Sequence, residues 1–120
     1  MKIFLIGPMG SGKSKIGKIL SEKLSVSLFD IDKEIEKDLK MPITEMFASK
    51  GEEFFRTTET NYLIKTKKFN DCIISTGGGV VEKIKNLELL ANETNVVFLN
   101  CSVESPVSYT HLTLPTTPVV

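Results

Sequence analysis

Short apolar runs alternate along the chain with longer segments whose apolar residues recur at helical spacing. The continuous runs predict buried strands at residues 3–6, 26–29, 72–75 and 96–99. The segments of helical period predict helices at residues 13–24, 31–39, 43–47, 52–69 and 82–91. Strands that are apolar throughout and separated by helices are typical of a parallel sheet covered on both faces. The pattern therefore predicts a three-layer α/β fold.

The pattern stops after Glu104. The 15 basic and 15 acidic side chains all precede the last sixteen residues, SPVSYTHLTLPTTPVV. Pro106, Pro115 and Pro118 forbid a regular helix across most of this segment. We expect one folded domain at residues 1–104 and a segment foreign to that fold, unstructured, at residues 105–120. The alternative is a tail that binds a partner.

The equal numbers of basic and acidic side chains argue against a nucleic-acid or anionic-membrane surface, because either needs a basic excess. The apolar run at residues 3–6 is too short for a signal peptide or a membrane span. Cys72 and Cys101 stand far apart, which favours two buried thiols in a reducing compartment over a disulfide. We therefore expect a cytoplasmic protein with neither nucleic acid nor membrane as partner.

The loop between the first strand and the first helix carries a phosphate-binding motif. Residues 7–14, GPMGSGKS, fit G-x-x-x-x-G-K-[ST] at every fixed position. Backbone N–H groups of such a loop, with the positive end of the following helix, suit a polyphosphate. We expect Lys13 to reach the β- and γ-phosphates and the Ser14 hydroxyl to ligate Mg²⁺. The motif predicts ATP or GTP and leaves the acceptor open; the alternative is a glycine-rich turn without a ligand.

Two acidic residues end the second predicted strand, in the segment FDID. Strand ends beside a phosphate loop face the same crevice, so a turn here would let one of Asp30 and Asp32 face the metal and the other a substrate. Asp32 is equally suited to cap the following helix. Farther along, the Arg56 guanidinium could bind a substrate carboxylate through two hydrogen bonds. The alternative there is an ordinary surface ion pair between Arg56 and Glu59.

Three consecutive glycines, residues 77–79, end the third predicted strand. They would let ligand atoms meet backbone N–H groups without intervening side chains. The alternative is a flexible turn between strand and helix. A purely structural turn would seldom need all three glycines, because each costs chain entropy on folding.

Taken in order, GPMGSGKS, FDID, PITEMF, GEEFFRTTE and STGGG resemble the motifs of shikimate kinases over residues 1–104. That family consists of small P-loop kinases of the nucleoside-monophosphate-kinase type. The resemblance implies the three-layer P-loop NTPase fold and transfer of the γ-phosphoryl group of ATP to the 3-hydroxyl of shikimate, on the route to chorismate and the aromatic amino acids. The implied partners are ATP and shikimate, with Mg²⁺ as cofactor and a monomeric chain.

The resemblance also implies roles for individual residues, with Lys13, Asp32 and Arg56 as the catalytic set. Asp32 would bind ring hydroxyls and take the proton from the attacking one, while Arg56 would clamp the shikimate carboxylate. The residues implied to hold the ATP phosphates are Gly10, Ser11, Gly12, Lys13, Ser14 and Lys15, with Ser14 and Asp30 for Mg²⁺. The residues implied to contact shikimate are Asp32, Phe47, Phe55, Arg56, Glu59, Gly77, Gly78 and Gly79.

The chain departs from the family after the fourth predicted strand. Family members continue with a lid that carries an essential arginine, a further substrate arginine, an adenine-binding loop and a fifth strand. Arg56 is the only arginine of this sequence. We therefore expect a C-terminally truncated chain with negligible turnover. The sequence allows two other interpretations of the function. The chain could be a gluconate or nucleoside-monophosphate kinase, or a nucleotide-binding module without acceptor chemistry.

Overall fold

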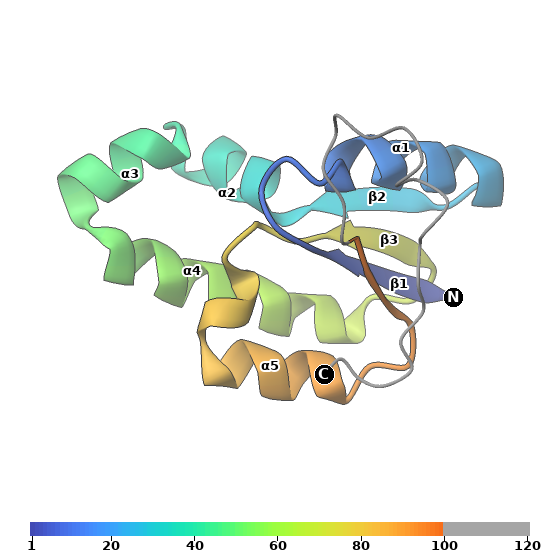
Figure 1. Ribbon diagram of the computed structural model, residues 1–120. Helices are drawn as coiled ribbons and strands as arrows, with labels where there is room; N and C mark the ends of the chain where they lie inside the picture. The colour runs from blue at the N-terminus through green and yellow to red at the C-terminus, as the bar shows by residue number, and fades with distance from the viewer. Residues whose placement is uncertain (100–120) are drawn as a thin grey trace.

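Four parallel strands form the centre of the fold in the computed structural model, which describes residues 1–99 (Figure 1). The strands are β1 (Lys2–Ile6), β2 (Ser27–Asp30), β3 (Cys72–Ser75) and β4 (Val96–Phe98). Their order in the sheet is β2-β3-β1-β4, so the first strand lies between the third and the fourth. Phe4 of β1 pairs with Ile74 on one side and Val96 on the other. The predicted parallel α/β sheet is confirmed.

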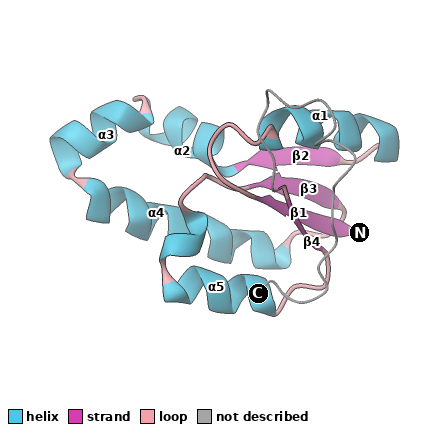
Figure 2. Cartoon of the chain, in the orientation of Figure 1, coloured by secondary structure: helices cyan, strands magenta, loops and turns pink. Residues whose placement is uncertain are grey.

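Helices cover both faces of this sheet (Figure 2). The helix α1 (Lys13–Leu24) packs on one face, where Leu5 and Ile73 are fully buried. The helices α4 (Glu52–Lys65) and α5 (Ile84–Ala91) lie on the other face, against Phe4 and Ile74. Neighbouring residues of each strand thus enter opposite cores, as the pleat requires. This explains why the strand sequences are apolar throughout.

Two shorter helices, α2 (Ile31–Leu39) and α3 (Ile43–Lys50), extend beyond the ends of the strands (Figure 1). Ile31, Ile35 and Met46 anchor them in the core shared with α4, and each of these side chains is fully buried. Gly51 ends α3, with its N–H donating to Phe47 O and Met46 O. The two helices therefore form a wall next to the strand ends.

The predicted bounds of α1 and β3 agree with the structure, whereas two predicted helices are shorter. The helix predicted at residues 52–69 ends at Lys65, and a 3-10 turn follows at Thr66–Lys68. There the Thr66 hydroxyl donates to Leu63 O, and Phe69 is already extended. The helix predicted at residues 82–91 begins at Ile84, because Lys83 is extended after a 3-10 turn at Val80–Glu82.

Some predictions fall outside residues 1–99, including those on residues 105–120 and on Cys101. Cys72 is a buried, free thiol, and burial raises its pKa. None of the helices within residues 1–99 has the length and apolar character that crossing a membrane demands.

The carboxyl ends of three strands meet at one edge of the sheet. The phosphate loop follows β1, α2 follows β2 directly, and residues 76–79 follow β3. Thr76 ties two of these segments together, since its N–H and its hydroxyl both donate to Leu5 O, at 3.1 and 2.8 Å. Segments far apart in the sequence are thereby brought to one place, where the candidate site lies.

Candidate functional site

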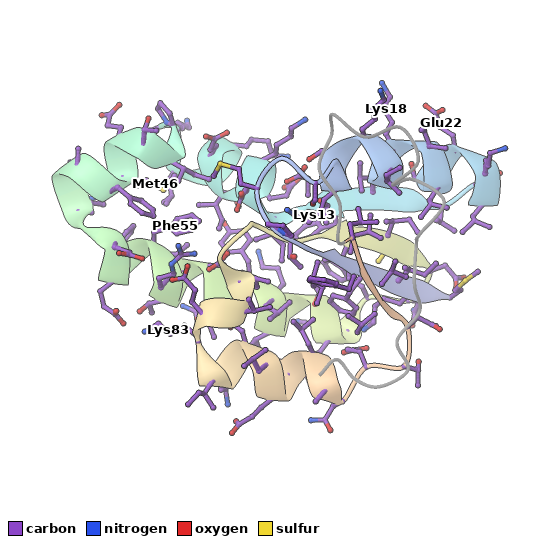
Figure 3. The ribbon with its side chains drawn as sticks, in the orientation of Figure 1. Lys13, Lys18, Glu22, Met46, Phe55 and Lys83 are labelled. Carbon is purple, nitrogen blue, oxygen red and sulfur yellow. The ribbon has the colours of Figure 1, made fainter. Side chains whose placement is uncertain are left out.

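The phosphate loop holds Lys13 folded back over its own carbonyl groups. The ammonium donates to Gly7 O at 2.7 Å and to Pro8 O at 3.0 Å, and Lys13 is only 8% exposed. Burial lowers the pKa of Lys13, while the carboxylates of Asp32 and Asp30 raise it part of the way back. Figure 3 shows Lys13 at the centre of the molecule, in contrast to Lys18 on the outer side of α1. The carbonyl groups of the phosphate loop therefore hold the Lys13 ammonium in a buried position beneath the loop.

The first turn of α1 is open to an anion. Gly12 precedes the helix in the left-handed conformation (φ 91°, ψ 18°), which strongly favours glycine. No side chain caps this helix, and its first turn contains no acidic residue. Because the first N–H groups of a helix have no partner within the helix and lie at the positive end of its dipole, such a turn suits an anion such as phosphate.

Ser14 and Asp30 meet at the mouth of this loop. The Ser14 hydroxyl donates to Asp30 Oδ2 at 2.8 Å, and Asp30 Oδ1 accepts a hydrogen bond from the Lys33 N–H. Both groups supply hard oxygen atoms, and Mg²⁺ is commonly held by one or two such ligands together with substrate phosphates. No group of three acidic, histidine or cysteine side chains within residues 1–99 could form a fuller metal cage. The pair fits a Mg²⁺ ion that arrives with a nucleotide.

The cap of α2 is Asp30 and not Asp32, so the capping alternative for Asp32 is wrong. The strand β2 runs to Asp30, which is still extended (φ −95°, ψ 109°), and the helix begins at Ile31. Asp32 thus lies in the first turn, and its Oδ1 is buried without a hydrogen-bond partner among residues 1–99. Burial raises the pKa of Asp32, and Asp30 adds to this rise. Asp32 is free to accept a hydrogen bond from a ligand.

Arg56 and Glu59 form a partly buried ion pair on α4, in contrast to the surface pair of the alternative interpretation. Arg56 Nη1 donates to Glu59 Oε1 at 3.0 Å, and the Glu59 side chain is fully buried. The guanidinium carbon lies 5.4 Å from the ring centroid of Phe55 and 5.8 Å from that of Phe47. Burial raises the pKa of Glu59, although the hydrogen bond from Arg56 opposes the rise. Burying such a pair is costly, which favours a role beyond stability.

The three glycines, residues 77–79, form what we call the glycine turn, and it touches both groups of charged residues. A Cβ at Gly77 would lie 2.7 Å from Asp32 Oδ1 and 3.0 Å from Glu59 Oε2. Any side chain at Gly77 would therefore displace one of these carboxylates. Gly78 lies against the backbone of Met9, with the corresponding distance to Met9 N being 3.0 Å. The glycine turn thus joins the phosphate loop to α4 by close contact.

Two neighbouring cavities divide the predicted site residues. A phosphate cavity of about 420 Å³ is lined by Met9, Gly10, Gly12, Lys13, Ser14, Lys15, Asp30, Asp32, Lys33, Glu36, Ile43, Thr76, Gly77 and Gly78. An arginine cavity of about 490 Å³ is lined by Glu52, Glu53, Arg56, Glu82 and Lys83. The predicted nucleotide residues and Asp32 therefore share one cavity, except that Ser11 is buried beneath it. Arg56 opens into the other cavity, and Phe47 and Phe55 line neither.

Besides Glu59, Arg56 has two acidic neighbours that the sequence analysis did not predict, Glu52 and Glu82. Arg56 Nε donates to Glu52 Oε2 at 3.3 Å, and Arg56 Nη2 lies 3.9 Å from Glu82 Oε1. Burial lowers the pKa of Arg56, but the hydrogen bonds and charges of Glu59, Glu52 and Glu82 together outweigh it, and the pKa stands above its ordinary value. The spacing of Glu52 four residues before Arg56 was a usable signal, whereas Glu82 is brought in only by the chain reversal after the glycine turn.

Comparison with known proteins gives consistent matches. The family described as "Shikimate kinase" matches residues 9–119. A shikimate kinase of Caldicellulosiruptor bescii is 43% identical to this chain, in an alignment that covers 86% of this chain and 60% of the relative. A shikimate kinase of Staphylococcus aureus is 40% identical, in an alignment that covers 85% of this chain and 58% of the relative. The chain thus spans about three fifths of the length of these relatives.

Solved structures agree with these sequence matches. The shikimate kinase of Acinetobacter baumannii in complex with shikimate superposes with a TM-score of 0.81 at 36% identity, covering 92% of this chain and 62% of that one. The shikimate kinase of Aquifex aeolicus superposes with a TM-score of 0.79 at 36% identity, covering 87% and 62%.

Proposed function

The chain belongs to the shikimate kinase family, and from this premise we propose that its site serves the Mg²⁺-dependent transfer of the γ-phosphoryl group of ATP to the 3-hydroxyl of shikimate. The observation that carries the proposal is the phosphate cavity, where Lys13, Ser14 and the unpaired Asp32 carboxylate face the same space. A kinase site needs a group that binds phosphate and a group that accepts the hydroxyl proton, and both lie here at the same edge of the sheet.

In this mechanism the phosphate loop holds the triphosphate. The open N-terminus of α1 receives the phosphate oxygens, and the Lys13 ammonium leaves its contacts with Gly7 O and Pro8 O to meet the β- and γ-phosphates. Ser14 and Asp30 would hold Mg²⁺, which neutralises charge on the transferring group when bound. Most of the catalysis is then positioning and neutralisation of charge.

Asp32 orients the acceptor in this proposal. Its buried Oδ1 accepts the hydrogen bond of the shikimate 3-hydroxyl and then its proton, as this oxygen bonds to the γ-phosphorus and the bond from the γ-phosphorus to the bridging oxygen breaks to release ADP. The raised pKa of Asp32 brings the carboxylate closer to the pH at which a general base works well. The Asp32 side chain also contacts Gly77, so its position is constrained from the side of β3.

Arg56 binds the shikimate carboxylate in this proposal, with Glu59 holding the guanidinium in place. The Glu59 hydrogen bond uses Nη1 only, so Nη2 remains for an anionic ligand. Phe47 and Phe55 lie beside the guanidinium, their ring centroids 5.3 Å apart, and offer an apolar wall for the carbon ring. Gly78 supplies a backbone N–H to the substrate. We place this chemistry in the cytoplasm, with ATP and shikimate as partners, in keeping with the free Cys72 thiol.

Calorimetric titration of the 120-residue chain with Mg-ATP, shikimate, gluconate and a nucleoside monophosphate tests the proposal. We expect Mg-ATP and shikimate to bind and the other two acceptors not to bind. Stronger binding of gluconate or of the monophosphate would assign the chain to another small-molecule kinase. Binding of Mg-ATP without any of the acceptors would reduce the chain to a nucleotide-binding module.

A further inference from the structure

A buried asparagine on α5 joins the segment after the glycine turn to α4. Asn86 is fully buried, its Nδ2 donates to Val80 O at 2.8 Å, and its Oδ1 accepts from the Thr60 hydroxyl at 2.7 Å. Both polar ends of one side chain are therefore used, on two different elements. Figure 1 shows that α5 lies beside α4, on the same side of the sheet.

The two partners of Asn86 are the immediate neighbours of the residues that would bind the substrate acid. Thr60 follows Glu59 directly on α4, one turn after Arg56. Val80 follows Gly79 directly, and its N–H closes the glycine turn by donating to Gly77 O at 3.2 Å. One amide therefore fixes the end of the glycine turn relative to the helix that carries Arg56 and Glu59.

The glycine turn lies so close to Arg56 on α4 that a small change in their separation would move the guanidinium. A Cβ at Gly79 would stand 2.6 Å from Arg56 Nη1 and Nη2, so the guanidinium already touches the backbone of the turn. A sub-ångström shift of the turn would change where Nη2 points. In a binding site, displacements on the order of 1 Å are enough to cost a large part of the function.

Packing alone does not require an amide at this position. The surrounding core contains Leu63, Val80 and Leu90, all buried, and an apolar side chain at residue 86 would fill similar space without the cost of burying an amide. Apolar contacts, however, are not directional, whereas two hydrogen bonds at 2.7 and 2.8 Å set both distance and orientation. The amide therefore fixes a geometry that apolar packing would leave looser.

We infer that Asn86, acting with Thr60, is a positioning residue that sets the affinity for the substrate carboxylate through the spacing of the glycine turn and Arg56. This inference rests on the proposed function, because it concerns the acid-binding half of that site. Within residues 1–99 neither Asn86 nor Thr60 forms a hydrogen bond with the phosphate loop, and neither lines the phosphate cavity, so the link acts on the acid-binding half of the site more directly than on ATP.

The test is calorimetric titration of Thr60→Val and Asn86→Leu with shikimate, with shikimate methyl ester and with Mg-ATP. Thr60→Val is nearly isosteric and removes only the hydroxyl donor, so it keeps the test valid if Asn86→Leu fails to fold. Leu89→Ala is the matched control, since Leu89 is a partly buried side chain on the same helix that packs against the same core. Measurements are made at a temperature where thermal unfolding shows each variant folded.

For Thr60→Val we expect the Kd of shikimate to rise about tenfold, the Kd of Mg-ATP to stay unchanged and the ester to be affected much less. Leu89→Ala should leave all three affinities unchanged. Unchanged shikimate affinity in Thr60→Val, an equal loss for ATP, or an equal loss in Leu89→Ala overturns the inference. If the wild-type chain binds Mg-ATP but no shikimate, the proposed function itself fails, and the inference fails with it.

Discussion

The Arg56 guanidinium lies directly against the backbone of Gly79. A Cβ at Gly79 would stand 2.6 Å from Nη1, 2.6 Å from Nη2 and 2.8 Å from Cζ of Arg56. The φ of Gly79 is −102°, which any residue can adopt, so the glycine is required by space and not by backbone conformation. The glycine turn is therefore a fitted surface for Arg56 and not merely a flexible connection.

Gly79→Ala should displace Arg56 from this surface. We expect a loss of shikimate affinity on the order of 10²-fold, with Mg-ATP affinity unchanged, because Gly79 does not line the phosphate cavity. Titration calorimetry with both ligands measures this. Val81→Ala, in the adjoining 3-10 turn and 40% exposed, is the control and should bind both ligands normally. Wild-type shikimate affinity in Gly79→Ala would contradict the role given to this contact.

Glu82 should compete with the substrate for Arg56. Its carboxylate lies 3.9 Å from Arg56 Nη2, and its side chain is 60% exposed, so the interaction is weak but adds negative charge where an anion must bind. We expect Glu82→Gln to tighten shikimate binding about threefold, in the range of an exposed ion pair. The effect should shrink as salt is added, since exposed charges are screened.

Glu53→Gln is the matched control for this prediction. Glu53 lines the same cavity, but its carboxylate is paired with Lys83 at 2.7 Å and has no bond to Arg56. Its replacement should leave shikimate affinity unchanged. Equal tightening in both variants would show that only the general charge of the cavity matters.

Lys13→Met should abolish most of the Mg-ATP affinity. The Lys13 ammonium is the buried cation of the phosphate loop, and hydrogen bonds between charged groups are each worth about 1.5–3 kcal/mol, or roughly 10- to 100-fold in affinity. Lys18→Met, on the outer side of α1 (Figure 3), controls for the loss of one positive charge and should bind Mg-ATP normally. Titration with Mg-ATP distinguishes the two; similar losses in both would refute a specific role for Lys13.

Asp32→Asn should stabilise the folded chain at neutral pH. The pKa of Asp32 is raised above its ordinary 3.8, so the folded chain holds this proton more tightly than the unfolded chain does. The stability contributed by Asp32 therefore falls as the pH rises from its unfolded pKa through its folded pKa. We expect a gain of about 1 kcal/mol in the free energy of unfolding at pH 7, which disappears near pH 3. Urea denaturation at the two pH values measures it.

Asp30→Ala should have the opposite effect on stability. Asp30 caps α2 through the Lys33 N–H, and loss of such a cap costs about 1 kcal/mol. The two substitutions would thus change the free energy of unfolding in opposite directions, because Asp30 stabilises the fold whereas Asp32 destabilises it at neutral pH. Destabilisation by both substitutions at pH 7 would mean that Asp32 also serves the fold.

The sequence was sufficient for most of the fold because strands buried on both faces and a phosphate loop have strong local patterns. All four strands and α1 follow from those patterns within a residue or two. The ends of α4 and α5 were less predictable, since Thr66 and Lys83 change the backbone through single hydrogen bonds and dihedral angles. Such local choices are made by tertiary packing and leave little trace in periodicity.

The site divides in the same way. Lys13 and Ser14 follow from a motif whose residues are close in sequence, and Asp30 follows from its place at the end of the second strand. The burial of Glu59 and the tie between Thr60 and Asn86 depend on how α4 and α5 pack, which no local pattern encodes. One trace of that tie was available, because Asn86 lies four residues before the buried Leu90 and so places an amide on an apolar helix face.

In the proposed binding mode, Arg56 and Asp32 hold opposite ends of one shikimate molecule beside the phosphate loop. A crystal structure of the chain grown with shikimate measures this most directly. We expect to find the shikimate carboxylate within hydrogen-bonding distance of the Arg56 guanidinium and a ring hydroxyl hydrogen-bonded to the Asp32 carboxylate. Shikimate bound with its carboxylate on Lys13, or bound away from Arg56 altogether, would contradict it.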